Sequence, residues 1–340
     1  MVPSKSMNRG IKMIKDKTIE EYLIIDGHSD IPRHLYLKYQ EGIKNSFHED
    51  HYLPLKKGQV NIVVVNIFTK ESNKSPLNQG MMQIHLVNEV LKNNKDVVLI
   101  LEVEDLKNVI ASKKIGLILS MEGFEPLEGE VDLLHIFYKL GVRAGMLTWN
   151  SKNDFASGPD TKEALSEKGI KVIQLMNALN MLVDVSHLNE EGFWQVISIS
   201  DGPVIASHSN ARELFNHPRN LSDDQMKAIA KTGGIIGVVP YFSKVDFAEP
   251  SKPRLNDDNS ETIEDYIKHI EYIVDLVGYD HVAFGFDFNI YLGDFGVKGI
   301  ENTEKITNVI TLLLQRGHAI DDIEKITGKN LLRVFNTVLE

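Results

Sequence analysis

The chain has 340 residues and a formal net charge of −11, from 48 acidic and 37 basic side chains. An acidic protein is a poor partner for nucleic acid or anionic membranes, so we expect neither. The absence of cysteine excludes disulfides, thiolate metal sites and a cysteine nucleophile.

No apolar run reaches the ~18 residues that a membrane span needs. Residues 1–17 lack the apolar segment of a signal peptide, and we interpret them as a flexible leader of a cytoplasmic protein. Residues 18–340 show no repeat, low-complexity segment or linker composition, so we expect them to form a single domain. We leave open whether the chain forms a homodimer.

Eight apolar runs rich in β-branched residues are typical of buried parallel strands. They span 23–28, 60–68, 115–121, 145–149, 182–187, 204–208, 235–239 and 281–287. Helical patterns separate most of these runs, at 78–94, 162–178, 226–231, 259–277 and 303–316. Ser222 and Gln225 predict a capping box before the third of these helices. The run 97–103 fits either a hairpin strand or a helix end, and 246–259 is typical of an exposed loop.

Alternating strands and helices predict an α/β fold, a (β/α)8 TIM-type barrel, in which active sites lie at the carboxyl ends of the strands. Five residues of metal-binding type stand at such ends. His28 and Asp30 are two apart, and alternation along a strand would place them on one face. Glu122, His187 and His208 end three later runs. We therefore expect the five side chains to converge.

Three imidazoles and two carboxylates suit Zn²⁺, and also Mn²⁺, Co²⁺ or Fe²⁺. One catalytic zinc takes about three protein ligands, so five ligands predict two divalent ions, most simply Zn²⁺. Glu122 would bridge them, with His28 and Asp30 on one ion and His187 and His208 on the other. Two such ions lower the pKa of a bridging water to roughly 7, which predicts hydrolysis by hydroxide.

The motifs around these residues resemble those of the membrane (renal) dipeptidases, the zinc dipeptidases of peptidase family M19. The resemblance covers nearly the whole chain, from about residue 24 to residue 335, with the motifs in the family's order. They include Asp26-Gly27-His28-Ser29-Asp30, Ser120-Met121-Glu122-Gly123, Val183-Asp184-Val185-Ser186-His187, Ala206-Ser207-His208-Ser209-Asn210, His217-Pro218-Arg219-Asn220-Leu221 and Gly285-Phe286-Asp287-Phe288. The cysteines and lipid-anchor tail of the animal enzyme are missing, which favours a soluble, bacterial-type member.

The resemblance implies a barrel of the metal-dependent hydrolase kind with a binuclear zinc site, in which the ligands are those deduced above and Glu122 bridges. It also implies that Arg219 binds substrate and that Asp287 is a catalytic acidic residue. Arg219 would fork onto the carboxylate of a dipeptide, and Asp287 would hold its ammonium or pass a proton to the leaving amine. Family members cleave dipeptides and often accept a D-residue on the carboxyl side.

The chain departs from the family at the end of the fourth predicted strand. Relatives such as the renal enzyme carry a histidine there that contacts the scissile group, whereas this chain has Trp149. We expect Trp149 to line the substrate site, with packing under the barrel rim as the competing interpretation. Asn289 replaces a second acidic residue of the family.

Two other functions remain open. A metal-dependent amidohydrolase acting on a non-peptide or cyclic amide also fits a histidine and an aspartate on the first strand. Such enzymes often add a bridging lysine at the end of the fourth strand, and this chain has none there. A structural, metal-holding protein would keep the ligands without a substrate clamp, whereas Arg219 and Asp287 form one.

Overall fold

The computed structural model describes residues 18–70, 75–241, 243, 261–290 and 296–340. The predicted leader at 1–17 and the predicted loop at 246–259 lie outside these ranges. None of the helices in the described ranges combines the length and the apolar composition needed to cross a bilayer.

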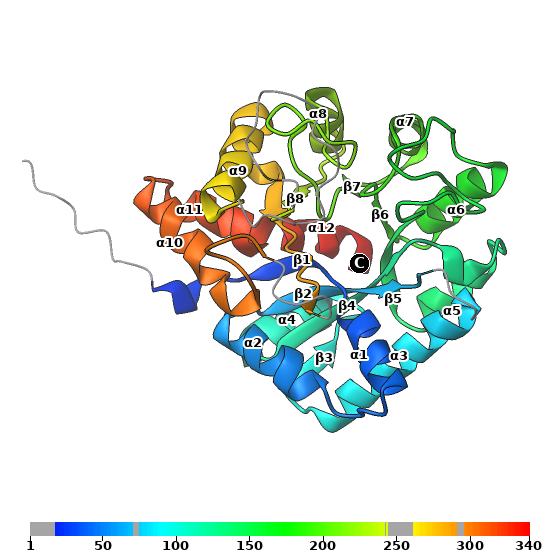
Figure 1. The fold of residues 1–340 in the computed structure, drawn as a ribbon, viewed down its shortest axis with the longest axis horizontal. Helices are drawn as coiled ribbons and strands as arrows, with labels where there is room; N and C mark the ends of the chain where they lie inside the picture. Colours follow the sequence, from blue (N-terminus) through cyan, green and yellow to red (C-terminus); the bar gives the residue numbers. More distant parts are fainter. Residues whose placement is uncertain (1–17, 71–74, 242, 244–260, 291–295) are drawn as a thin grey trace, which may run out of the picture.

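A curved parallel sheet forms the centre of the molecule (Figure 1). Its strands are β1 (Ile25–Ser29), β2 (Ile62–Phe68), β3 (Val97–Leu99), β4 (Ile115–Glu122), β5 (Val142–Met146), β6 (Leu182–Asp184) and β7 (Val204–Ile205). They pair in the order β1-β2-β4-β5-β6-β7, and β3 pairs with the first half of β4. A second parallel pair contains β8 (Ile236–Val238) and β9 (Val282–Phe284).

Contacts between the two sheets bring the strands round into a barrel. A bridge between Ala206 and Ile236 joins the end of β7 to β8. On the other side, the backbone N–H of Asp287 donates to the carbonyl of His28 at 3.1 Å, where β9 meets β1. The predicted (β/α)8 barrel class is thereby confirmed.

Helices pack around the sheet (Figure 1). They are α1 (Ile31–Gln40), α2 (Leu53–Lys57), α3 (Pro76–Asn93), α4 (Val103–Ser112), α5 (Leu133–Lys139), α6 (Glu167–Ala178), α7 (Glu190–Ile199), α8 (Asp223–Lys231), α9 (Ile263–Val277), α10 (Thr307–Gln315), α11 (Ile320–Glu324) and α12 (Asn330–Leu339). The capping box before α8 is confirmed, because Ser222 Oγ accepts from the N–H of Gln225 and Gln225 Oε1 accepts from the N–H of Ser222.

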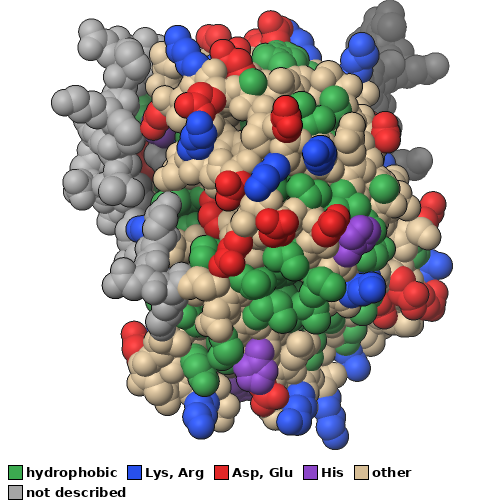
Figure 2. Space-filling model, turned by 90° about the vertical axis from the view of Figure 1, so that its right-hand side faces the viewer, with side chains coloured by type: hydrophobic (Ala, Val, Ile, Leu, Met, Phe, Trp, Pro, Cys, Tyr) green, Lys and Arg blue, Asp and Glu red, His purple; other side chains and the backbone are tan. Residues whose placement is uncertain are grey.

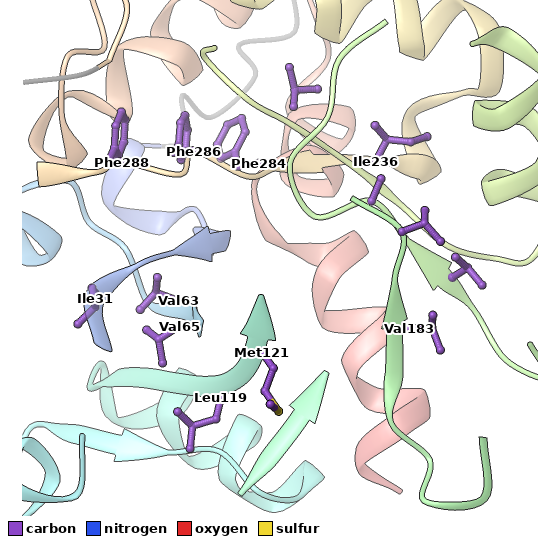
Figure 3. Close-up of a cluster of buried hydrophobic side chains, with 14 of the residues drawn as sticks. Ile31, Val63, Val65, Leu119, Met121, Val183, Ile236, Phe284, Phe286 and Phe288 are labelled. Carbon is purple, nitrogen blue, oxygen red and sulfur yellow. The ribbon is translucent and has the colours of Figure 1, made fainter. Parts of the chain in front are cut away.

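Alternation along the strands divides the core into two layers. One set of strand residues packs against the surrounding helices, and Figure 3 shows part of it, including Val63, Val65 and Leu119. The alternate set, including Val64 and Ile118, lies inside the barrel and packs against α12. At roughly 25 cal/mol per Å² of apolar surface, this two-sided burial is the main stabilising contribution to the fold. Polar residues follow at the carboxyl ends of the strands.

Two sequence predictions need correction. The fourth strand was expected at 145–149, but β5 ends at Met146, and Trp149 lies three residues beyond it. The ladder stops because Met146 pairs with Glu122, the last residue of β4. The run 97–103 is neither a hairpin strand nor simply a helix end. Its first part is β3, which runs parallel to β4, and its last residue begins α4.

The face in Figure 2 mixes acidic and basic side chains and gathers hydrophobic side chains near its centre. Several large apolar side chains of the described chain are exposed, among them Ile136 at 46% on α5 and Trp194 at 40% on α7. A homodimer in which a second copy of the chain covers such a surface stays a prediction, and sedimentation of the protein would test it.

Candidate metal centre

The first ligand pair lies where β1 gives way to α1. His28 belongs to β1, but Asp30 is already the N-cap of α1. The pairing of β1 with β2 shifts register between Asp26 and Ser29, so regular strand alternation is not what brings the pair together. The chain turn does so instead, and His28 Nε2 lies 3.9 Å from Asp30 Oδ1. Both side chains are buried.

Glu122, the last residue of β4, stands between the two ligand groups. Its Oε2 lies 3.5 Å from Nε2 of His28. Its Oε1 lies 3.0 Å from Nε2 of His187 and 3.8 Å from Nε2 of His208. Each carboxylate oxygen therefore faces a different group of histidines. This is the arrangement expected of a bridging ligand.

His187 and His208 form the second group. Their Nε2 atoms are 2.9 Å apart, and both rings are buried. His187 has a left-handed backbone, with φ of +70°, which costs free energy and is often retained at functional sites. The His208 ring also lies 3.8 Å, centroid to centroid, from that of His28, so the two ligand groups are contiguous.

The far nitrogens of the three rings contact polar side chains that the sequence analysis did not single out. His187 Nδ1 lies 2.8 Å from Asn150 Oδ1, an acceptor, so Nδ1 carries the proton and Nε2 is left with its lone pair. Ser207 Oγ lies 2.9 Å from Nδ1 of His208 and 3.3 Å from Nδ1 of His28. Asn66 Nδ2 lies 3.1 Å from Nδ1 of His28. The inward-facing alternation of β2 could have indicated Asn66, and the position directly before His208 could have indicated Ser207.

Two buried aspartates fix the strand ends that carry the ligands. Asp26 Oδ1 accepts from the backbone N–H groups of His28 and Phe286, at 3.3 and 3.0 Å, and so joins the end of β1 to the end of β9. Asp184 Oδ1 accepts from the N–H of Ser207 at 3.1 Å and so joins β6 to β7. Both belong to the motifs named above, but their positions became apparent only in the fold.

Asp287 and Arg219 both reach the ligand cluster. Asp287 Oδ1 lies 3.6 Å from His28 Nε2, and the left-handed φ of Asp287, +50°, turns its side chain at the end of β9. Arg219 is buried, and its Nη2 donates to the carbonyl of His208 at 3.3 Å. Tyr241, which the sequence analysis missed, donates its hydroxyl to the carbonyl of Asp287 at 2.9 Å, and Asn289 donates to the same carbonyl at 3.0 Å.

Trp149 lies at the rim of this cluster. Its ring centroid is 6.1 Å from that of His187 and 5.0 Å from that of Phe68, the last residue of β2. The indole is half-buried. Trp149 therefore packs against Phe68 at the rim and also lies beside His187.

Burial dominates the electrostatics of the cluster. It raises the pKa of Glu122 to about 8, although the Arg219 guanidinium acts in the opposite direction. It also raises the pKa of Asp287 well above its usual range and lowers the pKa of His187 and His208. Buried carboxylates that are this costly to ionise are stabilised by a nearby cation.

The donor set fits a divalent metal. His28 Nε2 is fully buried and makes no hydrogen bond within the described part of the chain, yet it faces three carboxylates. Ligand atoms of His28, Glu122 and His208 lie within 4.8 Å of one another, and so do those of His28, Asp30 and Asp287. Nitrogen and oxygen ligands at such spacing suit Zn²⁺ or a similar first-row ion.

A parallel α/β barrel with histidines and carboxylates converging at the carboxyl ends of its strands belongs to the class of metal-dependent hydrolases. The family model of the membrane dipeptidases (peptidase family M19) matches residues 14–340, so the chain belongs to this family. It is accordingly a hydrolase, a metallo-dipeptidase, as the motifs predict.

Individual relatives agree with this assignment. An uncharacterized protein in the pqqA 5′ region of Klebsiella pneumoniae is 35% identical over 249 residues, which cover 71% of this chain and 88% of that protein. The dipeptidase aclJ of Aspergillus oryzae is 28% identical over 361 residues, covering 99% of this chain and 83% of that protein. A metallo peptidase from Rhodobacter sphaeroides, solved with a phosphinate mimic of the dipeptide L-Ala-D-Ala, shares the fold with a TM-score of 0.82. It is 22% identical, covering 93% of this chain and 99% of that one.

Proposed function

We propose that the chain hydrolyses the peptide bond of dipeptides, including those with a D-residue on the carboxyl side, with two divalent ions, most simply Zn²⁺. His28, Asp30 and Glu122 would hold one ion, and Glu122, His187 and His208 the other. One observation carries this proposal, namely that the two oxygens of Glu122 face different histidine groups. The complex of the R. sphaeroides relative with an L-Ala-D-Ala mimic supports the D-residue.

When bound, such ions would lower the pKa of a bound water to roughly 7 and would polarise the scissile carbonyl. Because its two oxygens face the two histidine groups, Glu122 would lie in contact with the reacting atoms. The strands and α12 bury the inner side of the site. The charges of its residues would therefore act in a medium of low dielectric constant.

Arg219 and Asp287 would bind the two ends of the substrate. The planar guanidinium of Arg219 can accept the terminal carboxylate in a fork, and burial strengthens that contact. Asp287 lies 3.6 Å from His28 Nε2, close enough to the reaction centre to hold the substrate ammonium or to pass a proton to the leaving amine. Two opposite charges at fixed positions favour a substrate of dipeptide length.

The amidohydrolase alternative lacks its distinguishing residue in this structure. The segment that follows β5 carries Trp149, and the nearest lysine after it, Lys152, is exposed and pairs with Glu163.

Metal removal and reconstitution test the proposal. The chelated protein should lose hydrolysis of L-Ala-L-Ala and L-Ala-D-Ala and regain it as about two equivalents of Zn²⁺ are added. N-acetyl-Ala-Ala and Ala-Ala amide serve as controls, because each lacks one terminal charge. Recovery at one equivalent would contradict the two-ion site, and equal rates on all four compounds would contradict the clamp.

A further inference from the structure

Beside the ligand cluster, the rim carries an aromatic pair, Phe68 and Trp149. Phe68 ends β2, and Trp149 follows β5, so the pair lies on the side of the barrel formed by β2, β4 and β5. The Trp149 ring is 6.1 Å from the ring of His187, so the pair lies next to the reaction centre. Arg219 follows β7, on another part of the barrel.

Two basic side chains lie over this aromatic pair. Nζ of Lys70 is 5.8 Å from the centre of the Trp149 ring, and Cζ of Arg33 is 5.9 Å from the centre of the Phe68 ring. Arg33 also donates to Gln79 Oε1 at 3.4 Å, which fixes its direction. We call these four residues, Arg33, Phe68, Lys70 and Trp149, the basic wall.

Neither cation of the basic wall is neutralised by an acid of the described chain. No carboxylate of residues 18–70, 75–241, 243, 261–290 or 296–340 lies within ion-pair distance of Arg33 or Lys70. Many other basic groups are paired, such as Lys107 with Glu104 at 3.6 Å. Arg33 and Lys70, which lie beside the reaction centre, are therefore available to pair with an anionic group of a substrate.

We infer that the basic wall is a subsite for the side chain of an acidic residue, Glu or Asp, at the amino-terminal position of the dipeptide. This inference rests on the proposed function, which gives the terminal carboxylate to Arg219. The side chain of the amino-terminal residue would then lie toward the side of the barrel formed by β2, β4 and β5. The aromatic faces pack against its methylene groups, while Lys70 and Arg33 attract its carboxylate.

Paired substrates test the inference. Glu-Ala and Gln-Ala have the same shape and differ in one charge, so the ratio of their kcat/KM values measures recognition of that charge. We expect Glu-Ala to be preferred by about two- to fivefold per cation, the size of an exposed ion pair. Raising the ionic strength to 1 M, where the Debye length is about 3 Å, should reduce the ratio.

Substitutions locate the effect. Lys70→Met and Arg33→Gln should each lower the Glu-Ala to Gln-Ala ratio, and Lys70→Glu should bring it below one and favour Lys-Ala. Arg33→Lys keeps the charge and should retain most of the preference. Lys107→Met is the matched control, because this lysine lies on α4 and is already paired. It should leave the ratio as in the parent enzyme.

The outcomes separate the two proposals. Cleavage of Gln-Ala without any preference for Glu-Ala would refute the basic wall while leaving the dipeptidase proposal standing. A preference for Ala-Glu in place of Glu-Ala would refute the assignment to the amino-terminal residue. Failure to cleave any of the three would refute the dipeptide substrate itself, and the basic wall with it.

Discussion

Asp287 and His28 make two contacts, although Asp287 follows the last strand of the barrel and His28 lies on the first. The Asp287 backbone N–H donates to the His28 carbonyl at 3.1 Å, and its Oδ1 lies 3.6 Å from His28 Nε2. The first contact helps to close the barrel, and the second brings a carboxylate to the ligand cluster. The segment that helps to close the barrel therefore also places the proposed acid.

Asp287→Asn should separate the two contacts, because it keeps the backbone hydrogen bond and removes the charge. We expect kcat to fall by about 100-fold or more, the usual contribution of an acid–base group, with little change in Tm. Asp280→Asn is the control, since this exposed aspartate pairs with Lys325 at 3.0 Å, away from the site. Unchanged kcat in the Asp287 variant would refute the catalytic role.

Glu122→Gln tests the bridge through metal content. Because both ligand groups face this carboxylate, we expect the variant to bind well under two equivalents of Zn²⁺ and to lose activity. His187→Ala should retain one equivalent, since the His28 group is left intact. Elemental analysis after equilibrium dialysis measures both. If Glu122→Gln retains two ions, the residue is not shared between the ions.

Much of this centre could be predicted from the sequence. The parts that could not be predicted depend on contacts between residues far apart in the chain. Glu122, His187 and His208 were predicted because strand-end positions meet in a barrel. For His28 and Asp30 the expected convergence is present, but the reason given was wrong, since a register shift and a helix N-cap bring them together. Local sequence patterns could not show that α12 packs against the inward-facing strand residues, or that Asp26 joins β1 to β9, because both depend on contacts between residues far apart in the chain. Predicting the convergence of Glu122, His187 and His208 needed only local patterns.

Arg219→Lys tests carboxylate recognition, because lysine keeps the charge but loses the planar fork. We expect kcat/KM to fall by about tenfold or more for Ala-Ala and much less for Ala-Ala amide. Arg212→Lys is the control on the same loop, since Arg212 donates to the carbonyl of Asn220 and pairs with Glu190. Parallel losses on the two substrates would show that Arg219 does not read the carboxylate.

Asn66 should control metal affinity through His28. Its Nδ2 lies 3.1 Å from His28 Nδ1, while its Oδ1 is buried without a hydrogen-bond partner in the described chain. Turning the amide over lets Oδ1 accept from a protonated Nδ1, which leaves Nε2 of His28 for the metal. We expect Asn66→Ala to weaken Zn²⁺ binding by about 10- to 100-fold in calorimetric titration.

Asn66→Asp provides the matching rescue, because a carboxylate accepts the same hydrogen bond. It should restore most of the Zn²⁺ affinity lost in Asn66→Ala. A purely structural role predicts a different pattern, in which both variants lower Tm and neither changes the affinity of the folded protein. Melting curves recorded beside the titrations decide between the two.

Trp149→His tests the position at which this chain departs from its family. An imidazole that can carry charge donates a hydrogen bond about 1 kcal/mol stronger than a neutral indole, so kcat on Ala-Ala should rise by about fivefold. Loss of the ring contact with Phe68, at 5.0 Å, should lower Tm by only about 1–3 °C. Trp194→His, at the exposed tryptophan of α7, is the control.

Measuring kcat/KM for Ala-Ala, Ala-D-Ala and Ala-Phe beside melting curves separates the two roles of Trp149. A larger fall in Tm with an unchanged ranking of substrates would show that Trp149 only supports the rim.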